Sequence, residues 1–397
     1  MKLGTSSLVV AAFIGPGTVL TCATAGLGFG YDLGWVLLFA TVAVFVLQSY
    51  TAGTGILAGK GLGEALREAA DTPAKRWATT ALIVLGLWIG CAAFETGNLV
   101  GAAAGVQAML GLEGDMRWLV GGCALVAGLL LRLRMRLLIQ ILAVCVGGMS
   151  LTFLATLALA PVDWGSALAG LLQPALPEAS PLVAVALVGT TIVTYNLFLH
   201  PSAARAYWAG ESPRAAWRGE LLGMALFIPV GGLISFAILV AGATLAGEGG
   251  TVSQVADLAA LLEPALGGAA PYLFGAGLLA AGLTSAVTAP LAAAAGIREL
   301  FGWPDDPRDP RATAVWLSVV VVGLLFNLTG FSPLAVIVAA QAANGLLLPL
   351  IAAFVVYLAY RQQEVRLPRW YLALGVGITL VCAGLGARTL WWVWGAI

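Results

Sequence analysis

The sequence predicts an all-α protein that crosses a membrane many times. Hydrophobic residues make up 60% of its 397 residues, and charged residues make up only 10%. A soluble chain of this length cannot bury so much apolar surface, so the composition indicates a polytopic membrane protein. The apolar runs are continuous rather than alternating, which favours membrane helices over the strands of a β-barrel.

Each crossing of the hydrocarbon core needs about 20 residues. On that basis the apolar runs divide into eleven predicted helices, near 5–29, 33–58, 78–109, 118–132, 137–160, 181–207, 216–244, 268–299, 313–330, 333–360 and 370–394. Two of the connecting segments, 163–180 and 247–267, are long enough to hold short surface helices.

The basic residues support this division. With these helices, 17 of the 19 Lys and Arg residues fall on one side of the membrane, and only Arg117 and Arg388 fall on the other. Basic residues gather on the cytoplasmic side of membrane proteins. We therefore expect a multi-pass protein of the plasma (inner) membrane, with a cytoplasmic N-terminus and an extracellular C-terminus.

The first predicted helix contains Gly15, Pro16 and Gly17 near its centre. Proline removes a backbone donor, and glycine lowers the cost of leaving helical geometry. Peptide groups freed inside hydrocarbon need a partner, so a break at this depth favours a binding site. The alternative is a simple proline kink in a packed helix.

A second interruption is predicted in the sixth helix, where residues 189–196 are small, hydroxyl-bearing or amide-bearing. Such a run is also compatible with ordinary packing between helices. Breaks at matching positions in two halves indicate inverted five-helix repeats with the substrate between them. We therefore predict one transporter domain over 1–397, with repeats over about 5–160 and 181–360 and an extra helix over about 370–394.

Several motifs resemble the Nramp family of divalent-metal transporters, in the order in which that family carries them. They are residues 15–60 (Gly15 to Thr18, Ala25-Gly26, Gly30-Tyr31, Trp35, Gln48, Gly55, Gly59-Lys60), Asn196 to His200, Gly277 to Gly282, and Gln341 with Leu348-Pro349. The resemblance implies a LeuT-type fold of ten core helices plus an eleventh, with helices 1 and 6 broken.

The same resemblance implies a metal site that this chain has altered. The family holds its metal with Asp and Asn of an Asp-Pro-Gly-Asn motif and with Met of a Met-Pro-His motif. At the matching positions this chain has Gly15 for the Asp, Thr18 for the Asn, Val193 for the Met and Tyr195 for the His. Of the side chains that the resemblance expects near the metal, only Gln341 is retained. Without a carboxylate, a dication in a site of low dielectric constant is poorly compensated. The sequence thus predicts a divergent member with no metal held by side chains.

The altered motif favours a small carboxylate-bearing solute, with an amino acid as the leading candidate, because a helix N-terminus attracts anions. The residues expected to bind it are Gly15, Pro16, Gly17, Thr18, Val193, Thr194, Tyr195, Asn196 and Gln341. Two alternatives remain open. One is a transporter for Mg²⁺ or Mn²⁺ with a rebuilt, partly hydrated site, and the other is a sensor or scaffold that kept the fold and tolerates loss of Gly15 and Gly17.

Three further residues are candidates for proton coupling in a symporter. Glu95 is the only acidic residue well inside a predicted helix, and carboxyl groups at that depth are often functional. The resemblance implies that Glu95 and Asn98 match two acidic residues of the family's third helix, and that His200 takes part in proton release. The alternative for both Glu95 and His200 is a structural role, satisfied by hydrogen bonds.

The motifs of several other function classes are missing from the sequence. There is no phosphate-binding Gly-x-x-x-x-Gly-Lys loop and no metalloprotease motif, and a single histidine gives little support to a Ser/His/Asp arrangement. A formal net charge of zero gives no sign of a nucleic-acid partner. We expect a transporter rather than an enzyme, with no cofactor, acting on a small molecule in a lipid bilayer.

Overall fold

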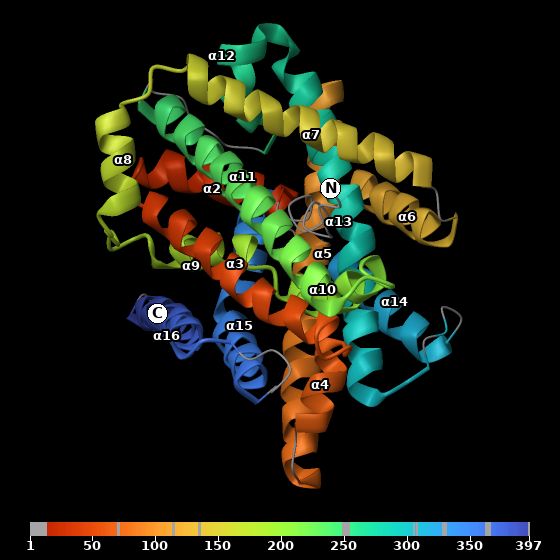
Figure 1. Ribbon diagram of the computed structural model, residues 1–397. Helices are drawn as coiled ribbons and strands as arrows, with labels where there is room; N and C mark the ends of the chain where they lie inside the picture. The colour runs from red at the N-terminus through yellow and green to blue at the C-terminus, as the bar shows by residue number, and fades with distance from the viewer. Residues whose placement is uncertain are drawn as a thin grey trace.

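The computed structural model describes residues 14–69, 72–112, 116–133, 136–247, 255–304, 306, 309–327, 332–361 and 367–395. Residues 5–13 of the first predicted helix lie outside this range, so the structure shows only the part of that helix that follows its predicted break. The described chain is almost entirely helical (Figure 1).

The helices follow the predicted order. They are α2 (Pro16–Phe29), α3 (Gly34–Ile56), α4 (Leu62–Ala69), α5 (Pro73–Leu110), α6 (Arg117–Leu133), α7 (Arg136–Leu159), α8 (Trp164–Leu172), α9 (Pro181–Thr191), α10 (Thr194–Tyr207), α11 (Pro213–Gly247), α12 (Glu263–Leu266), α13 (Ala270–Phe301), α14 (Pro310–Phe326), α15 (Pro333–Arg361) and α16 (Arg369–Gly395). Two 3₁₀ helices, Val255–Leu262 and Gly267–Ala269, flank α12.

Over the residues that the structure describes, every predicted membrane helix coincides with a helix or a helix pair. Among the described residues, seven helices are long and apolar enough to cross a membrane, or eight if a bent pair formed by α7 and α8 counts as one crossing. The other predicted crossings correspond to α2, α6 and α14, whose described helices are shorter. The division into two repeats stays a prediction.

The short helix α4 was not predicted, because its eight residues include Glu64, Arg67 and Glu68 and are too few for a membrane crossing. The predicted surface helix in 163–180 is present as α8. Its first turn is capped by Asp163, whose Oδ1 accepts hydrogen bonds from the backbone N–H groups of Gly165 and Ser166.

The long helix α5 forms the centre of the fold and packs against α13, α14 and α15 (Figure 1). Small residues allow the helices to approach closely, as is common in membranes. A Cβ at Gly105 would lie 2.5 Å from the backbone oxygen of Gly275, and one at Gly282 would lie 2.6 Å from that of Asn98. The close approach of α5 and α13 therefore depends on these glycines.

The half-helix α2 is held between α11 and α9. A Cβ at Gly242 of α11 would lie 2.6 Å from the backbone oxygen of Ala23, so glycine is required at this crossing. The last helix, α16, packs against α15, α9 and α3, and the hydroxyl groups of Ser49 and Tyr371 are joined by a hydrogen bond of 2.7 Å.

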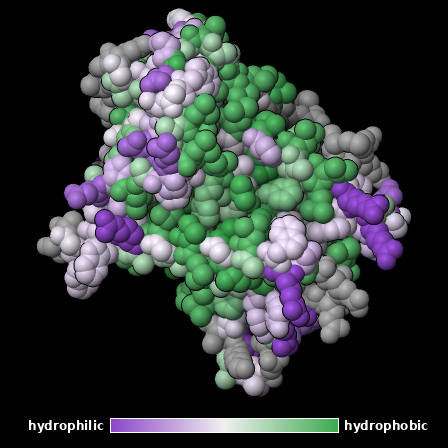
Figure 2. Space-filling view, turned by 60° about the vertical axis from the view of Figure 1, so that its left-hand side comes forward, coloured by the Kyte–Doolittle hydropathy of each residue, from purple (hydrophilic) through white to green (hydrophobic). Residues whose placement is uncertain are grey.

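The outer surface has the distribution of polarity expected of a membrane protein. On the face drawn in Figure 2, apolar residues form a broad continuous area, and hydrophilic residues gather around its edges. Many large apolar side chains are exposed in the described chain, including Leu125, Leu151 and Leu380 at 66–68%. In a bilayer this surface faces lipid, so its exposure needs no protein partner.

Candidate functional site

The first element of the site is the start of α2. Pro16 occupies the first helical position, where its missing N–H costs nothing and its fixed φ suits the helix. Gly15 precedes it in an extended conformation, with φ −91° and ψ 173°, and gives α2 no side-chain cap. The positive end of the α2 dipole therefore opens toward the centre of the protein.

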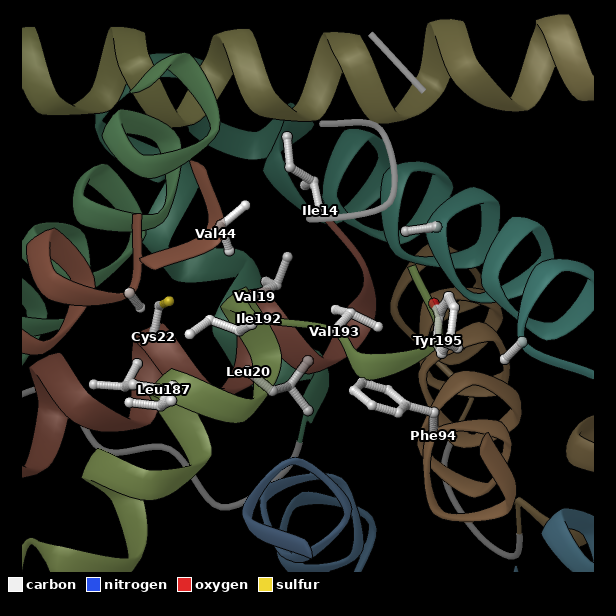
Figure 3. Packing of buried hydrophobic residues seen from close by; sticks show 14 of the residues in the cluster. Ile14, Val19, Leu20, Cys22, Val44, Phe94, Leu187, Ile192, Val193 and Tyr195 are labelled. Carbon is white, nitrogen blue, oxygen red and sulfur yellow. The ribbon is translucent and has the colours of Figure 1, made fainter. Parts of the chain in front are cut away.

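The second element is a break in the sixth predicted helix. α9 ends at Thr191 and α10 begins at Thr194, while Ile192 and Val193 leave helical geometry with ψ values of 81° and 114°. This confirms the interruption predicted from the polar run at 189–196. Figure 3 shows the unwound stretch with Val193 beside the packed rings of Phe94 and Tyr195.

Asn344 of α15 forms hydrogen bonds with the backbone oxygens that this break leaves without a helical partner. Its Nδ2 donates hydrogen bonds to the backbone oxygens of Gly189 at 2.6 Å and Ile192 at 3.1 Å. Its Oδ1 accepts one from the Thr194 hydroxyl at 2.7 Å. One buried amide thus joins α15 to both halves of the broken helix and supplies the partners that water cannot supply inside a membrane.

The two breaks and three neighbouring helices enclose a small cavity. Its lining residues are Gly15, Gly17, Thr18, Phe94, Asn98, Thr190, Val193, Tyr195, Ser285 and Gln341. Its volume is about 10 Å³, counted as room for the centre of a water molecule. That is about the space that a single bound water needs.

Six of the ten lining residues carry a neutral hydroxyl or amide group, namely Thr18, Asn98, Thr190, Tyr195, Ser285 and Gln341. The hydroxyl groups of Thr18 and Thr190 are 2.9 Å apart and share a hydrogen bond across the two breaks. Gln341 lies directly over Gly17, where any Cβ would overlap its amide nitrogen. The Oε1 of Gln341 is buried and has no hydrogen-bond partner among the described residues, so it is available to a bound solute or water.

The structure brings together most of the predicted binding residues, although not all. Those that line the cavity are Gly15, Gly17, Thr18, Val193, Tyr195 and Gln341. The other three lie outside it. Pro16 packs on Gly101 of α5, the hydroxyl of Thr194 donates to Asn344, and Asn196 is buried without a partner for its Nδ2 among the described residues.

Four residues of the site were not identified from the sequence. Thr190 belongs to the polar run of the sixth helix, and Asn344 is a mid-helix amide three residues after Gln341, so both carried a signal. Phe94 and Ser285 carried none, because an ordinary Phe or Ser inside an apolar helix does not show which neighbour it faces.

Glu95 does not line the cavity. It is fully buried, and neither carboxyl oxygen has a hydrogen-bond partner in the described part of the chain. Its side chain packs toward α14, where a Cβ at Gly323 would lie 2.7 Å from the Glu95 Cγ. Asn98, close to one helical turn further on, faces the cavity instead.

His200 also lies away from the cavity, in a buried polar cluster between α10 and α11. Its Nε2 is 3.0 Å from Glu220 Oε1, and Trp208 Nε1 donates to Glu220 Oε2 at 2.6 Å. Glu220 is fully buried and paired with His200. A part for His200 in proton release stays a prediction.

No cluster of conventional metal ligands is present within the described ranges. No group of three or more His, Cys, Asp or Glu side chains there lies close enough together to hold an ion. Any cation in the central cavity would instead meet hydroxyl, amide and backbone oxygens.

Comparison with known proteins identifies the family. The family model described as natural resistance-associated macrophage protein-like, Nramp, matches residues 6–392. The chain belongs to the Nramp family. It is therefore a multi-pass membrane protein and a secondary transporter, and not an enzyme.

Curated relatives of this Nramp protein are named for metal transport. The divalent metal cation transporter MntH of Acidiphilium cryptum is 29% identical over 390 residues, which cover 95% of this chain and 85% of the relative. The MntH protein of Verminephrobacter eiseniae is 29% identical and is matched over 87% of this chain and 78% of its own length.

Solved structures support the LeuT-type fold. The Eremococcus coleocola manganese transporter in complex with an aromatic bis-isothiourea substituted compound matches 97% of this chain and 85% of its own, with a TM-score of 0.73 and 19% identity. MhsT in complex with L-phenylalanine matches 99% of this chain and 98% of its own, with a TM-score of 0.64 and 14% identity. At these identities the likeness concerns the fold alone.

Proposed function

We propose that this Nramp-family transporter carries a divalent metal cation by alternating access, held between α2 and the α9–α10 break by neutral oxygen groups and part of its water shell. The observation that carries the proposal is the central cavity. It is lined by Thr18, Thr190 and Gln341 among other polar groups and has room for about one water molecule. An ion that has lost part of its water fits such a space.

The nature of the lining groups favours particular cations. Hydroxyl, carbonyl and water oxygens suit Mg²⁺ and Mn²⁺, whereas soft ions prefer sulfur. Val193 stands where the resemblance expects a methionine, and Gly15 where it expects an aspartate. We therefore propose Mg²⁺ or Mn²⁺ as cargo, bound without a carboxylate and more weakly than at a site that contains one. The metal transport named for the MntH relatives supports this choice.

The sequence alone led to a different preference, a carboxylate-bearing solute such as an amino acid. Such a solute stays the second candidate because the positive end of α2, at Gly15 and Gly17, opens onto the cavity and would attract a carboxylate. The size of the cavity argues against it. Pockets for organic ligands commonly occupy about 300–1,000 Å³, far more than the space that this conformation offers.

The Thr18 hydroxyl provides a direct test of the cavity. Thr18→Val keeps the shape of the side chain and removes an oxygen from the site, so we expect the apparent affinity for Mn²⁺ to fall about tenfold, the effect of about 1.4 kcal/mol. The measurement is Mn²⁺ or Mg²⁺ uptake into proteoliposomes that contain a fluorescent metal indicator.

Thr21→Val is the matched control. Thr21 is buried one turn further along α2 and does not line the cavity, so its replacement should leave uptake nearly unchanged. Radiolabelled amino acids are tested in the same vesicles. Uptake of an amino acid with no uptake of either cation would overturn the proposal and restore the second candidate.

We further propose that Glu95 couples transport to protons, with Asn98 between it and the cavity. A buried carboxyl group without a partner can gain or lose a proton when water reaches it. We expect Glu95→Gln to abolish the stimulation of uptake by an inward proton gradient while metal binding remains measurable. Glu178→Gln, at an exposed loop position, is the control. If the pH dependence of Glu95→Gln equals that of the wild type, Glu95 has no coupling role.

A further inference from the structure

A second and larger cavity lies at the basic end of α5, where its first turns meet the last turn of α13. It measures about 550 Å³. Most of its wall is formed by Pro73, Arg76, Trp77, Thr80, Leu300 and Phe301. The four residues from α5 follow the spacing i, i+3, i+4 and i+7, so they share one face of that helix. The central transport site does not use this face.

The one charged side chain among the lining residues is basic. Arg76 is exposed and has no ion pair or hydrogen bond from its guanidinium to any described residue. Arg67 of α4 lies beside the cavity, because its guanidinium occupies the space where a Cβ on Gly302 would stand, next to Phe301. Two acidic side chains of this region pair with residues outside the cavity. Glu68 forms an ion pair with Lys60, and Glu299 accepts a hydrogen bond from the Ser202 hydroxyl.

The depth of the cavity follows from the length of α5. Its 38 residues extend about 57 Å at 1.5 Å per residue, whereas the hydrocarbon core is about 30 Å thick. A charged Arg76 belongs outside hydrocarbon, and an exposed tryptophan is typical of the membrane interface. Trp77 is 67% exposed. The cavity therefore lies at the level of the lipid headgroups.

The wall of the cavity is basic at one end and apolar at the other. The start of α5 adds the positive end of a helix dipole on the same side as Arg76. On the hydrocarbon side, Leu300 and Thr80 are buried and Phe301 is 41% exposed. A ligand that fills this space needs an anionic end for the guanidinium groups and an apolar part for Trp77 and Phe301.

We propose that this cavity binds an anionic phospholipid, with its phosphate at Arg76 and Arg67 and its upper acyl chains against Trp77, Leu300 and Phe301. Inorganic phosphate would satisfy the charges and leave the apolar wall uncovered. A zwitterionic lipid would bring its own cation toward Arg76. Basic pockets at the cytoplasmic surface of membrane proteins recognise acidic headgroups through the same physics. This inference does not depend on the identity of the transported solute.

The test compares lipid binding by the purified full chain and by two arginine variants. Phosphatidylglycerol, phosphatidylcholine and inorganic phosphate are added separately, and the apparent melting temperature and the lipids retained in native mass spectra are recorded. We expect phosphatidylglycerol alone to raise the melting temperature and to remain bound. Arg76→Gln should weaken its binding about tenfold, and Arg67→Gln should act in the same direction.

The matched control is Arg214→Gln, which removes an exposed arginine from the first turn of α11 and should bind phosphatidylglycerol as the wild type does. Arg76→Lys keeps the charge and should retain part of the binding. The proposal is overturned if both Arg76→Gln and Arg67→Gln bind phosphatidylglycerol like the wild type, if phosphatidylcholine binds equally well, or if inorganic phosphate alone gives the full shift.

Discussion

Gly15→Asp is expected to tighten binding of Mn²⁺ or Mg²⁺ by at least about tenfold, a gain of about 1.4 kcal/mol. Among the described residues a Cβ at Gly15 would meet only the Ser285 hydroxyl, at 3.4 Å, so the backbone at this position accepts a Cβ atom without a clash. Its extended backbone also suits aspartate at a helix N-cap. A carboxylate beside a dication in a poorly solvated cavity is strongly attractive. Isothermal titration and vesicle uptake both measure the change.

The same substitution separates the two candidate cargoes, because the added negative charge repels a solute that binds through its own carboxylate. For such a solute, Gly15→Asp should weaken binding about tenfold instead. Gly15→Asn has nearly the same shape and capping ability without the charge, and we expect it to leave cation affinity close to that of the wild type. Unchanged cation affinity in Gly15→Asp would contradict a cation site at this cavity.

The two glycines at the start of α2 differ in the space around them. Gly15 has space for a Cβ atom, whereas any Cβ at Gly17 would overlap Gln341. Only Gly17 is therefore required by packing.

Asn344→Leu is expected to destabilise the protein by about 2–5 kcal/mol and to reduce transport at least about tenfold. The substitution removes three hydrogen bonds and leaves the backbone oxygens of Gly189 and Ile192 buried without a partner. A buried polar group that loses its partner costs about 1–3 kcal/mol. Thermal unfolding of the purified protein measures the stability, and metal uptake by vesicles measures the transport.

Two further variants divide this effect among the three bonds. Thr194→Val removes only the hydroxyl that donates to Asn344, at an expected cost of about 1 kcal/mol. Asn344→Asp keeps the acceptor for Thr194 but removes both donors to the backbone, so it should resemble Asn344→Leu more than Thr194→Val. If Asn344→Leu unfolds no more easily than Thr194→Val, the amide does not support the broken helix.

Local features made the membrane helices predictable. A run of about 20 apolar residues must cross or line a membrane wherever it stands in the chain. The starts of helices were less well predicted, since α5 begins at Pro73 rather than 78. Its first turn carries Arg76, and a helix that continues beyond the hydrocarbon leaves no trace in hydropathy.

Part of the site was predictable because backbone breaks are local too. Pro16 between two glycines indicated the start of α2, and the polar run at 189–196 indicated the gap between α9 and α10. Residues contributed by α5, α13 and α15 depend on how each helix is rotated. Ser285 and Asn344 therefore became part of the site only when the helices were packed together.

The sequence by itself determined a helical membrane protein with two interrupted helices, because apolar length and the chemistry of proline and glycine act within a few residues. Only the tertiary structure decided which polar side chains face the cavity. Asn98 lines it while Glu95, less than one turn away, packs against α14. The physical reason is that residues three apart on a helix share a face only approximately. The packing of α13 and α14 around α5 therefore decides which α5 side chains face the cavity and which face a neighbouring helix.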